Sequence, residues 1–417
     1  MSASTIFYLI NIIVIFNFLL GRVLDYLNNR SFSPELPPEL ASFYDADKYK
    51  KSLLYHKEKE RLSTWEEILG FAAIMIFLWL HGFVWLNDLL EPLISNRIVL
   101  ALAYFGILSL ASGILSFPFG IYNTFVIEEK FGFNKTTVKT YITDKIKGII
   151  LATLLGGGLG YLFIWLMISI GPNFWIYTWA LAIILTLFLN MFYTSLIVPV
   201  FNKLTPLSAG ELRDKIDEYA LSVQFPVKNI MVINGSKRSA KANAFFSGMG
   251  KGKKIVLYDT LIDNHTTDEL VSILAHEVGH YKKKHIIQGM FISWIQIGFM
   301  LWLLSRFVFS DIISSALGAS HMEIHINLIA FGILFEPISL VIGILMNLLS
   351  RKNEYEADAF AVQTAQKPAF INALIRLSTD NLSNLRPHPA YVFFHYSHPT
   401  LLQRIEAIQK YRVFRSE

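Results

Sequence analysis

Seven apolar segments, separated by polar stretches, constrain this chain more than any other feature of its sequence. They span residues 6–24, 68–86, 98–117, 149–170, 174–201, 286–304 and 324–349. About 20 apolar residues in a helix cross the apolar core of a bilayer. The composition agrees, because 53% of the 417 residues are hydrophobic and only 17% are charged, against roughly a quarter charged in soluble proteins. We therefore predict an all-α integral membrane protein with seven transmembrane helices.

Charge on the connecting loops predicts the orientation of these helices. The loops after the first and third segments are rich in Lys and Arg, whereas those after the second, fourth and sixth carry few or none. Because basic loops stay in the cytoplasm, the odd-numbered helices lead inward. We expect the N-terminus outside and the C-terminal region in the cytoplasm. The first segment lacks a basic leader and a small-residue cleavage site, so we expect a retained helix.

The chain turns polar over residues 202–285, which predicts a small folded unit between the fifth and sixth helices. Residues 209–224 have the spacing of an amphipathic helix, 230–233 and 255–258 predict strands, and 242–247 is a possible third strand. The predicted parts are a five-helix membrane region, a cytoplasmic insert, two further membrane helices and a C-terminal cytoplasmic part: 1–201, 202–285, 286–349 and 350–417.

A His-Glu-Val-Gly-His stretch at 276–280 has the residue types and spacing of a zinc metallopeptidase. Thr266 and Glu269 predict a capped helix start just before it. On that helix His276 and His280 lie one turn apart on one face, where two imidazoles can bind one metal ion. Glu277 lies beside them, where it can take a proton from a water that the metal polarises. A chance match or a metal-free histidine pair is the alternative, and the helical context favours zinc.

The third metal ligand is expected just after the seventh segment. The chain has no cysteine, so any metal is held by His and carboxylates, and a catalytic zinc uses three protein ligands and one open position. If the seventh helix continues, Glu354 and Asp358 share a face and Glu356 points elsewhere. One carboxylate would bind zinc and the other would orient an imidazole; the spacing leaves open which is which. A solvated charge cluster is the alternative.

The setting of the motif excludes some other functions. An intramembrane protease carries its motif inside an apolar span, whereas here Asp268, Glu269 and the lysine run 282–284 surround it. We expect the motif helix to continue through His285 straight into the sixth segment, which places the metal at the cytoplasmic margin of the membrane. The net charge of +5 is segregated by loop, and nothing in the sequence supports nucleic-acid binding.

Several of these elements together resemble the CAAX prenyl protease family of zinc metallopeptidases, the M48 peptidases that also process the a-factor pheromone and prelamin A. They are the motif at 276–280, the Glu354/Asp358 pair, Asn243 within Ala-Asn-Ala-Phe-Phe, and the tail segment 395–404. The likeness covers essentially the whole chain. It implies helices enclosing a large water-filled chamber, with a gluzincin-like metalloprotease domain and one zinc ion at its cytoplasmic side.

The resemblance also implies roles for individual residues. Glu354 becomes the third ligand, with Asp358 supporting a ligand, while Asn243, His398 and Arg404 line the substrate groove. The residues alone leave alternatives open. Asn243 is either a contact for a peptide backbone or a turn residue. His398 either donates to the developing oxyanion or only precedes a helix start, and Arg404 either meets a substrate carbonyl or carboxylate or lies on the polar face of a helix.

The predicted function is therefore that of a membrane zinc endopeptidase with Glu277 as general base, in which His398 or Arg404 helps the zinc to hold the tetrahedral oxyanion. The resemblance implies a peptide or protein substrate with a prenylated C-terminus, cut to release the last three residues. It implies the endoplasmic reticulum membrane in a eukaryote and the inner membrane in a bacterium, where a quality-control role without prenylated substrates is the alternative. Membrane lipid is an expected partner. A non-enzymatic seven-span transporter or receptor with an incidental zinc site is the remaining alternative.

Overall fold

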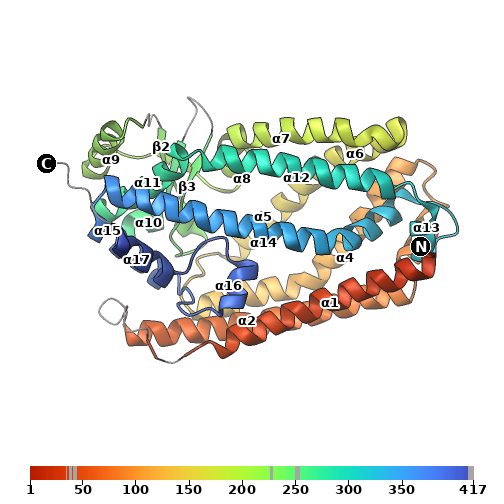
Figure 1. The fold of residues 1–417 in the computed structure, drawn as a ribbon, viewed down its shortest axis with the longest axis horizontal. Helices are drawn as coiled ribbons and strands as arrows, with labels where there is room; N and C mark the ends of the chain where they lie inside the picture. The colour runs from red at the N-terminus through yellow and green to blue at the C-terminus, as the bar shows by residue number, and fades with distance from the viewer. Residues whose placement is uncertain (34, 37–39, 41–44, 226–228, 249–253, 412–417) are drawn as a thin grey trace.

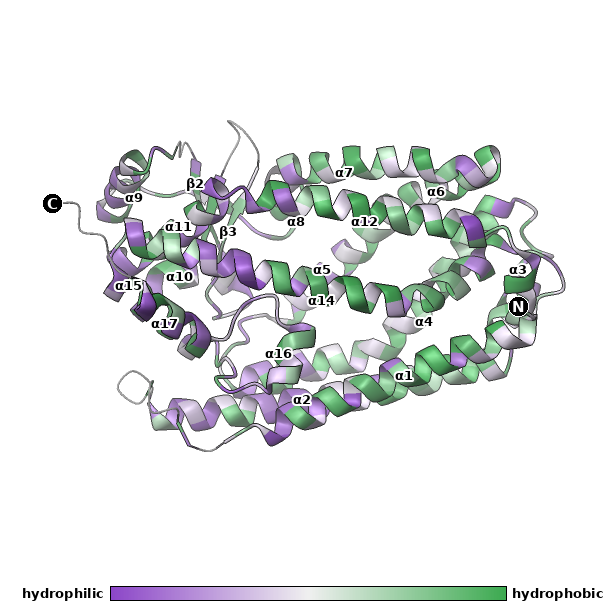
Figure 2. Ribbon diagram, in the orientation of Figure 1, coloured by the Kyte–Doolittle hydropathy of each residue, from purple (hydrophilic) through white to green (hydrophobic). Residues whose placement is uncertain are grey.

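The computed structural model describes residues 1–33, 35, 36, 40, 45–225, 229–248 and 254–411. The last residues of the predicted C-terminal part, 412–417, lie outside it. Long helices run roughly along one axis, and a small sheet with shorter helices lies at the end away from the N-terminus (Figure 1). Figure 2 shows hydrophobic residues along the long helices and hydrophilic residues concentrated at the end that carries the sheet. The predicted helical membrane architecture with a small sheet is confirmed.

Among the residues that the structure describes, six helical stretches are long and apolar enough to cross a membrane: Ala3–Arg30, Ala46–Trp79, Arg97–Glu128, Val138–Phe201, His285–Phe307 and Ile324–Thr364. The fourth stretch folds back on itself. Within it, α5 (Val138–Leu151) and α6 (Gly157–Ile170) run to a tight turn at Gly171–Asn173, after which α7 (Phe174–Leu196) and α8 (Val198–Phe201) follow. This turn lies between the fourth and fifth apolar segments of the sequence. Seven crossings are consistent with this geometry and stay a prediction.

The second predicted span is wrong at its end. The expected span 68–86 is broken, because α2 (Ala46–Trp79) stops where His81 adopts a left-handed conformation, with φ of 51°, and α3 (Gly82–Leu90) continues in a new direction. His81 packs closely against Gly318, where an added Cβ would lie 2.7 Å from the imidazole Nδ1. α2 is one continuous helix that joins a charged stretch to the apolar stretch after it. Its N-terminus is capped by Asp45.

Two polar residues within the membrane helices, Asn17 and Glu336, contact each other. In α1 (Ala3–Arg30) Asn17 donates a hydrogen bond to Glu336 of α14 (Ile324–Thr364). Glu336 also lines a cavity of about 490 Å³ between α2, α4 (Arg97–Tyr122) and α14. A carboxylate at this depth is costly in lipid, so it belongs on the inner face of the helix bundle. The larger chamber stays an expectation.

The described part of the insert contains one more strand than predicted. The sheet has the order β1-β2-β4-β3, formed by Leu204–Pro206, Asn229–Ile233, Lys254–Tyr258 and Ala244–Ser247. The central pair β2 and β4 is parallel and the outer pairs are antiparallel. β1 was missed because its three residues end in a proline, which is compatible only with an edge strand. α9 (Glu211–Ser222), α10 (Asp259–Asn264) and α11 (Thr267–Lys282) complete the insert.

The two soluble parts share one core. After α14 come α15 (Lys367–Asp380), α16 (Pro389–His395) and α17 (Leu401–Lys410). Buried side chains from the sheet, α11, α14, α15 and α17 form a single cluster that includes Ile255, Leu274, Val362 and Phe370. The C-terminal part therefore packs onto the insert across α14, and the motif helix lies between them.

Candidate metal centre

The motif helix α11 forms for the local reasons that the sequence indicates. The Thr266 hydroxyl accepts from the Glu269 backbone N–H at 3.3 Å, and the Glu269 carboxylate accepts from the Thr266 N–H at 2.9 Å. This capping box satisfies two of the open N–H groups at the helix start. Leu270, Leu274 and Val278 bury one face in the shared core.

α14 continues far beyond its apolar part and passes closely over α11. Its 41 residues run from Ile324 to Thr364 without a break, which confirms the continued helix that the third-ligand argument needs. At the crossing, a Cβ added to Gly279 would lie 3.0 Å from the Ala357 backbone and 3.1 Å from Cβ of Phe360. Glycine at 279 therefore lets the two helices approach, which brings their side chains to one point.

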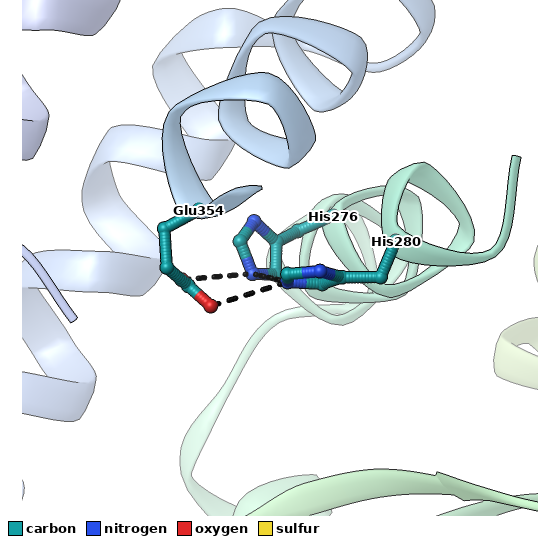
Figure 3. A group of neighbouring side chains, drawn as sticks. All are labelled: His276, His280 and Glu354. Atoms are coloured by element: carbon teal, nitrogen blue, oxygen red, sulfur yellow. Dashed lines mark hydrogen bonds and ion pairs between the residues drawn. The ribbon is translucent and has the colours of Figure 1, made fainter. Parts of the chain in front are cut away.

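Three predicted ligands meet at this crossing (Figure 3). His276 Nε2 lies 3.4 Å from Glu354 Oε2, and His280 Nε2 lies 3.2 Å from Glu354 Oε1. The two Nε2 atoms are 3.2 Å apart. One ligand atom from each residue lies within 4.8 Å of the others. The distances fit three groups arranged around a single ion.

These residues also fit a cation electrostatically. Glu354 is buried, and its Oε2 makes no hydrogen bond among the described residues. Burial disfavours a charged His276, yet contacts with Asp358 and Glu354 raise its pKa to about 9. The surroundings of His276 thus stabilise a positive charge. A divalent metal ion bound between the two imidazoles and the Glu354 carboxylate would supply such a charge.

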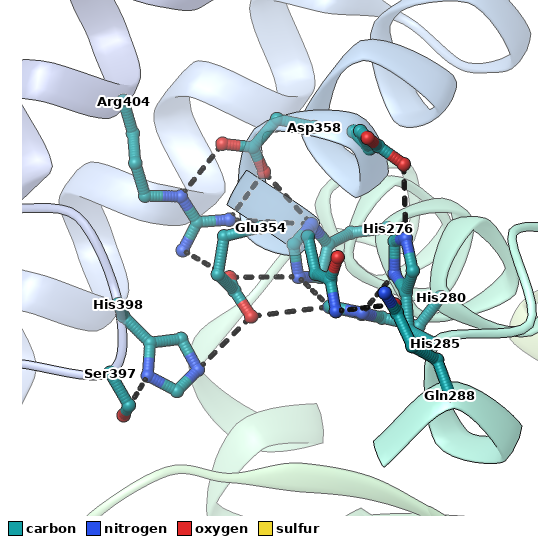
Figure 4. A network of polar contacts seen from close by, with 11 residues as sticks. His276, His280, His285, Gln288, Glu354, Asp358, Ser397, His398 and Arg404 are labelled. Atoms are coloured by element: carbon teal, nitrogen blue, oxygen red, sulfur yellow. Dashed lines mark hydrogen bonds and ion pairs between the residues drawn. The ribbon is translucent and has the colours of Figure 1, made fainter. Parts of the chain in front are cut away.

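Asp358 and Arg404 lie on the Nδ1 side of the His276 imidazole (Figure 4). Asp358 is fully buried and its Oδ1 lies 2.8 Å from His276 Nδ1, so it accepts the N–H that the metal-free nitrogen carries. Arg404 of α17 donates to both oxygens of Asp358, from Nε at 2.9 Å and from Nη2 at 2.5 Å. The arginine thereby fixes the carboxylate that orients His276, as outer partners of metal ligands commonly do.

The remaining predicted site residues line the cavity beside these ligands. It has a volume of about 310 Å³ and is bounded by Asn243, Glu277, His398 and Arg404, the three ligand residues, and six apolar or small residues: Ala244, Leu261, Ile273, Phe370, Leu374 and Leu377. Burial raises the pKa of Glu277, which makes its carboxylate a stronger base. The sequence did not indicate the apolar wall, because its members come from separate elements that include α10, α11 and α15.

His398 and Asn243 reach this cavity from different elements. His398 is exposed, with Nε2 3.2 Å from Glu354 Oε1 and Nδ1 2.9 Å from the Ser397 hydroxyl. Asn243 directly precedes β3, the last strand in the order of the sheet, and its side-chain oxygen accepts from the Ala244 N–H. β3 pairs with β4 on one side only among the described strands, so its outer edge can take an added peptide strand.

The junction between α11 and α12 (His285–Phe307) corrects one expectation. The motif helix does not run straight into the sixth segment, because α11 ends at Lys282 and Lys284 is left-handed, with φ of 60°. The resulting bend places His285 beside His280, with their Nδ1 atoms 3.0 Å apart. The sequence analysis did not assign His285 and its partner Glu356 to the site. The available signal was a third histidine five residues after the motif.

Comparison with known proteins agrees with this geometry. Two family models match: "CAAX prenyl protease N-terminal, five membrane helices" over residues 25–203, and "Peptidase family M48" over residues 206–412. Probable CAAX prenyl protease 1 of Schizosaccharomyces pombe is 36% identical over 389 residues, covering 90% of this chain and 82% of that protein. The chain belongs to the CAAX prenyl protease family of M48 peptidases.

A second relative and a solved structure extend the match over nearly the whole molecule. CAAX prenyl protease 1 of Saccharomyces cerevisiae is 33% identical over 414 residues, covering 92% of this chain and 91% of that protein. The crystal structure of S. mikatae Ste24p superposes with a TM-score of 0.91 at 32% identity, covering 99% of this chain and all of that one. The predicted family, the multi-pass membrane character and the metalloendopeptidase activity are confirmed, and the transporter or receptor alternative is not favoured.

Proposed function

We propose that this chain is a zinc endopeptidase that cuts prenylated CAAX-type proteins near the C-terminus and releases the last three residues. The main support is that His276, His280 and Glu354 lie together beside a cavity that Glu277 also lines. The CAAX prenyl protease relatives support the substrate class. We assign a cytoplasmic active site from the charge of the loops.

The protein groups divide the work of hydrolysis. When bound, zinc supplies Lewis acidity that activates water and polarises the scissile carbonyl. Glu277 takes the proton of the attacking water and then delivers it to the leaving amine. His398, which lines the cavity, donates to the developing oxyanion. Arg404 acts through Asp358 on the orientation of His276, and Asn243 holds the substrate backbone beside β3.

Replacement of one carboxylate tests this assignment. Glu277→Gln keeps the size of the side chain but removes the base, so we expect bound zinc to remain and kcat to fall by about 10²- to 10⁴-fold. The assay uses purified protein and a farnesylated C-terminal peptide. Glu406→Gln, on the exposed face of α17, is the matched control and is expected to be fully active. Unchanged proteolysis in Glu277→Gln would refute the role of Glu277.

The substrate class has its own comparison. The same peptide without its lipid should be cut far more slowly, because it lacks the anchor that holds it at the membrane. Equal rates for the two peptides, together with cleavage of misfolded membrane proteins, would instead support the quality-control alternative.

A further inference from the structure

His285 and Glu356 form a second network on the far side of His280. His285, the first residue of α12, is buried, with a side chain 6% exposed. Its Nδ1 lies 3.0 Å from His280 Nδ1 and its Nε2 lies 3.2 Å from Glu356 Oε2. The three groups thus form a chain of contacts that ends at a metal ligand (Figure 4 shows the two histidines).

The chemistry of the groups fixes the direction of every hydrogen bond in this chain. An ionised carboxylate only accepts, so His285 Nε2 carries the hydrogen that it donates to Glu356. A neutral imidazole has one N–H, so His285 Nδ1 accepts, and the donor is the Nδ1–H of His280. The lone pair of His280 is then on Nε2, the atom that faces Glu354 and His276.

We propose that Glu356 and His285 are positioning residues that hold His280 in the tautomer and orientation in which its Nε2 binds the metal. This inference rests on the proposed metal site and extends it to residues that touch neither metal nor substrate. The arrangement parallels the other ligand, where Asp358 accepts from His276 Nδ1 at 2.8 Å. Each histidine ligand then has its own acceptor, and α14 supplies the carboxylate in both networks.

The strained turn between α11 and α12 is what makes this contact possible. At about 100° per residue, positions five apart on a straight helix point roughly 140° away from each other. His280 and His285 can face one another only because Lys284 interrupts the helix with φ of 60° and ψ of 28°. A non-glycine residue in this region is unfavourable, and such strain persists where the surrounding structure requires it.

The surroundings of Glu356 supply a matched control. Glu356 is partly exposed and its other oxygen lies 3.8 Å from Lys352 Nζ, one turn earlier on α14. Both residues line a polar cavity of about 420 Å³ together with His285. Among the described residues, Lys352 pairs with the carboxylate and makes no hydrogen bond to either histidine, so its removal leaves the chain of donors and acceptors intact.

Zinc affinity, measured by chelator competition on the purified full-length protein, tests the inference. We expect His285→Phe and Glu356→Ala to weaken zinc binding by about 10- to 100-fold, the usual effect of losing an outer partner of a metal ligand. His285→Gln should stay within a few-fold of the wild type, because its amide oxygen accepts from His280 Nδ1–H. Lys352→Ala should match the wild type.

The outcomes separate this inference from the proposed function. Wild-type zinc affinity in Glu356→Ala and in His285→Phe would overturn the positioning role, whatever the protease activity. If His285→Phe does not fold, Glu356→Ala decides, since its side chain is partly exposed. An equal loss of zinc affinity in His285→Gln and His285→Phe would also overturn the positioning role, because an acceptor at this position would then make no difference. Failure of the proposed function would instead show as full activity of Glu277→Gln.

Discussion

Glu354 and Asp358 lie one helical turn apart, and the structure gives them different partners. Glu354 faces the Nε2 atoms of both histidines, whereas Asp358 faces the Nδ1 atom of His276 and the guanidinium of Arg404. We expect Glu354→Ala to lose its zinc on dialysis. Asp358→Ala should retain zinc with affinity weakened about 10- to 100-fold. Metal content measured by atomic absorption compares the two, and the reverse order would mean that the two roles are exchanged.

Arg404 is the only Lys or Arg that we find in direct contact with the buried Asp358 carboxylate within the described part of the chain. Arg404→Ala leaves that charge without its guanidinium partner, which typically costs about 3–5 kcal/mol. We expect a clear fall in the melting temperature of the protein. Lys410→Ala, which removes an exposed pair with Glu406 on the same helix, should leave the melting temperature unchanged. Equal melting temperatures for Arg404→Ala and the wild type would contradict this account.

At the scale of elements, the crossing of α11 and α14 depends on one glycine. Gly279→Ala places a methyl group 3.0 Å from the Ala357 backbone, so the helices must separate, at a cost of about 1–3 kcal/mol. We expect lower stability and weaker zinc binding, because the ligands lie on both helices. Gly289→Ala in α12 meets nothing within 4 Å and should be neutral or slightly stabilising. Zinc affinity and melting temperature of both variants measure the difference.

Local chemistry explains which elements the sequence predicted. The capping residues Thr266 and Glu269 and the spacing of His276 and His280 specify a helix and its metal-binding face without tertiary information. The bends at His81 and Lys284 could not be predicted, because a non-glycine residue adopts the left-handed conformation only rarely and tertiary contacts decide where it does. His285 was missed for the same reason, since only the bend turns it toward His280. Likewise, the apolar wall of the cavity is assembled from separate helices.

At the scale of the whole molecule, the absence of cysteine from the sequence makes the predicted orientation directly testable. Single cysteines label cleanly with a membrane-impermeant maleimide. In sealed vesicles whose cytoplasmic face points outward, we expect Ser208→Cys, exposed before α9, to react without detergent. Ser95→Cys, exposed between α3 and α4, should react only after detergent permeabilises the vesicles. The same accessibility for both positions would contradict the assigned topology.

α14 also sets a distance. Its 41 residues span about 62 Å at a rise of about 1.5 Å per residue, roughly twice the apolar thickness of a bilayer. Glu354 follows the predicted end of the apolar part, residue 349, by about five residues, which is a height of about 7–8 Å. An extended peptide covers that height in about two or three residues. If the substrate is anchored by its lipid, as proposed, the bond directly beside the lipidated residue reaches the metal centre only when the lipid rises from the apolar layer by about this height, so the length of the helix sets how far the anchor must move.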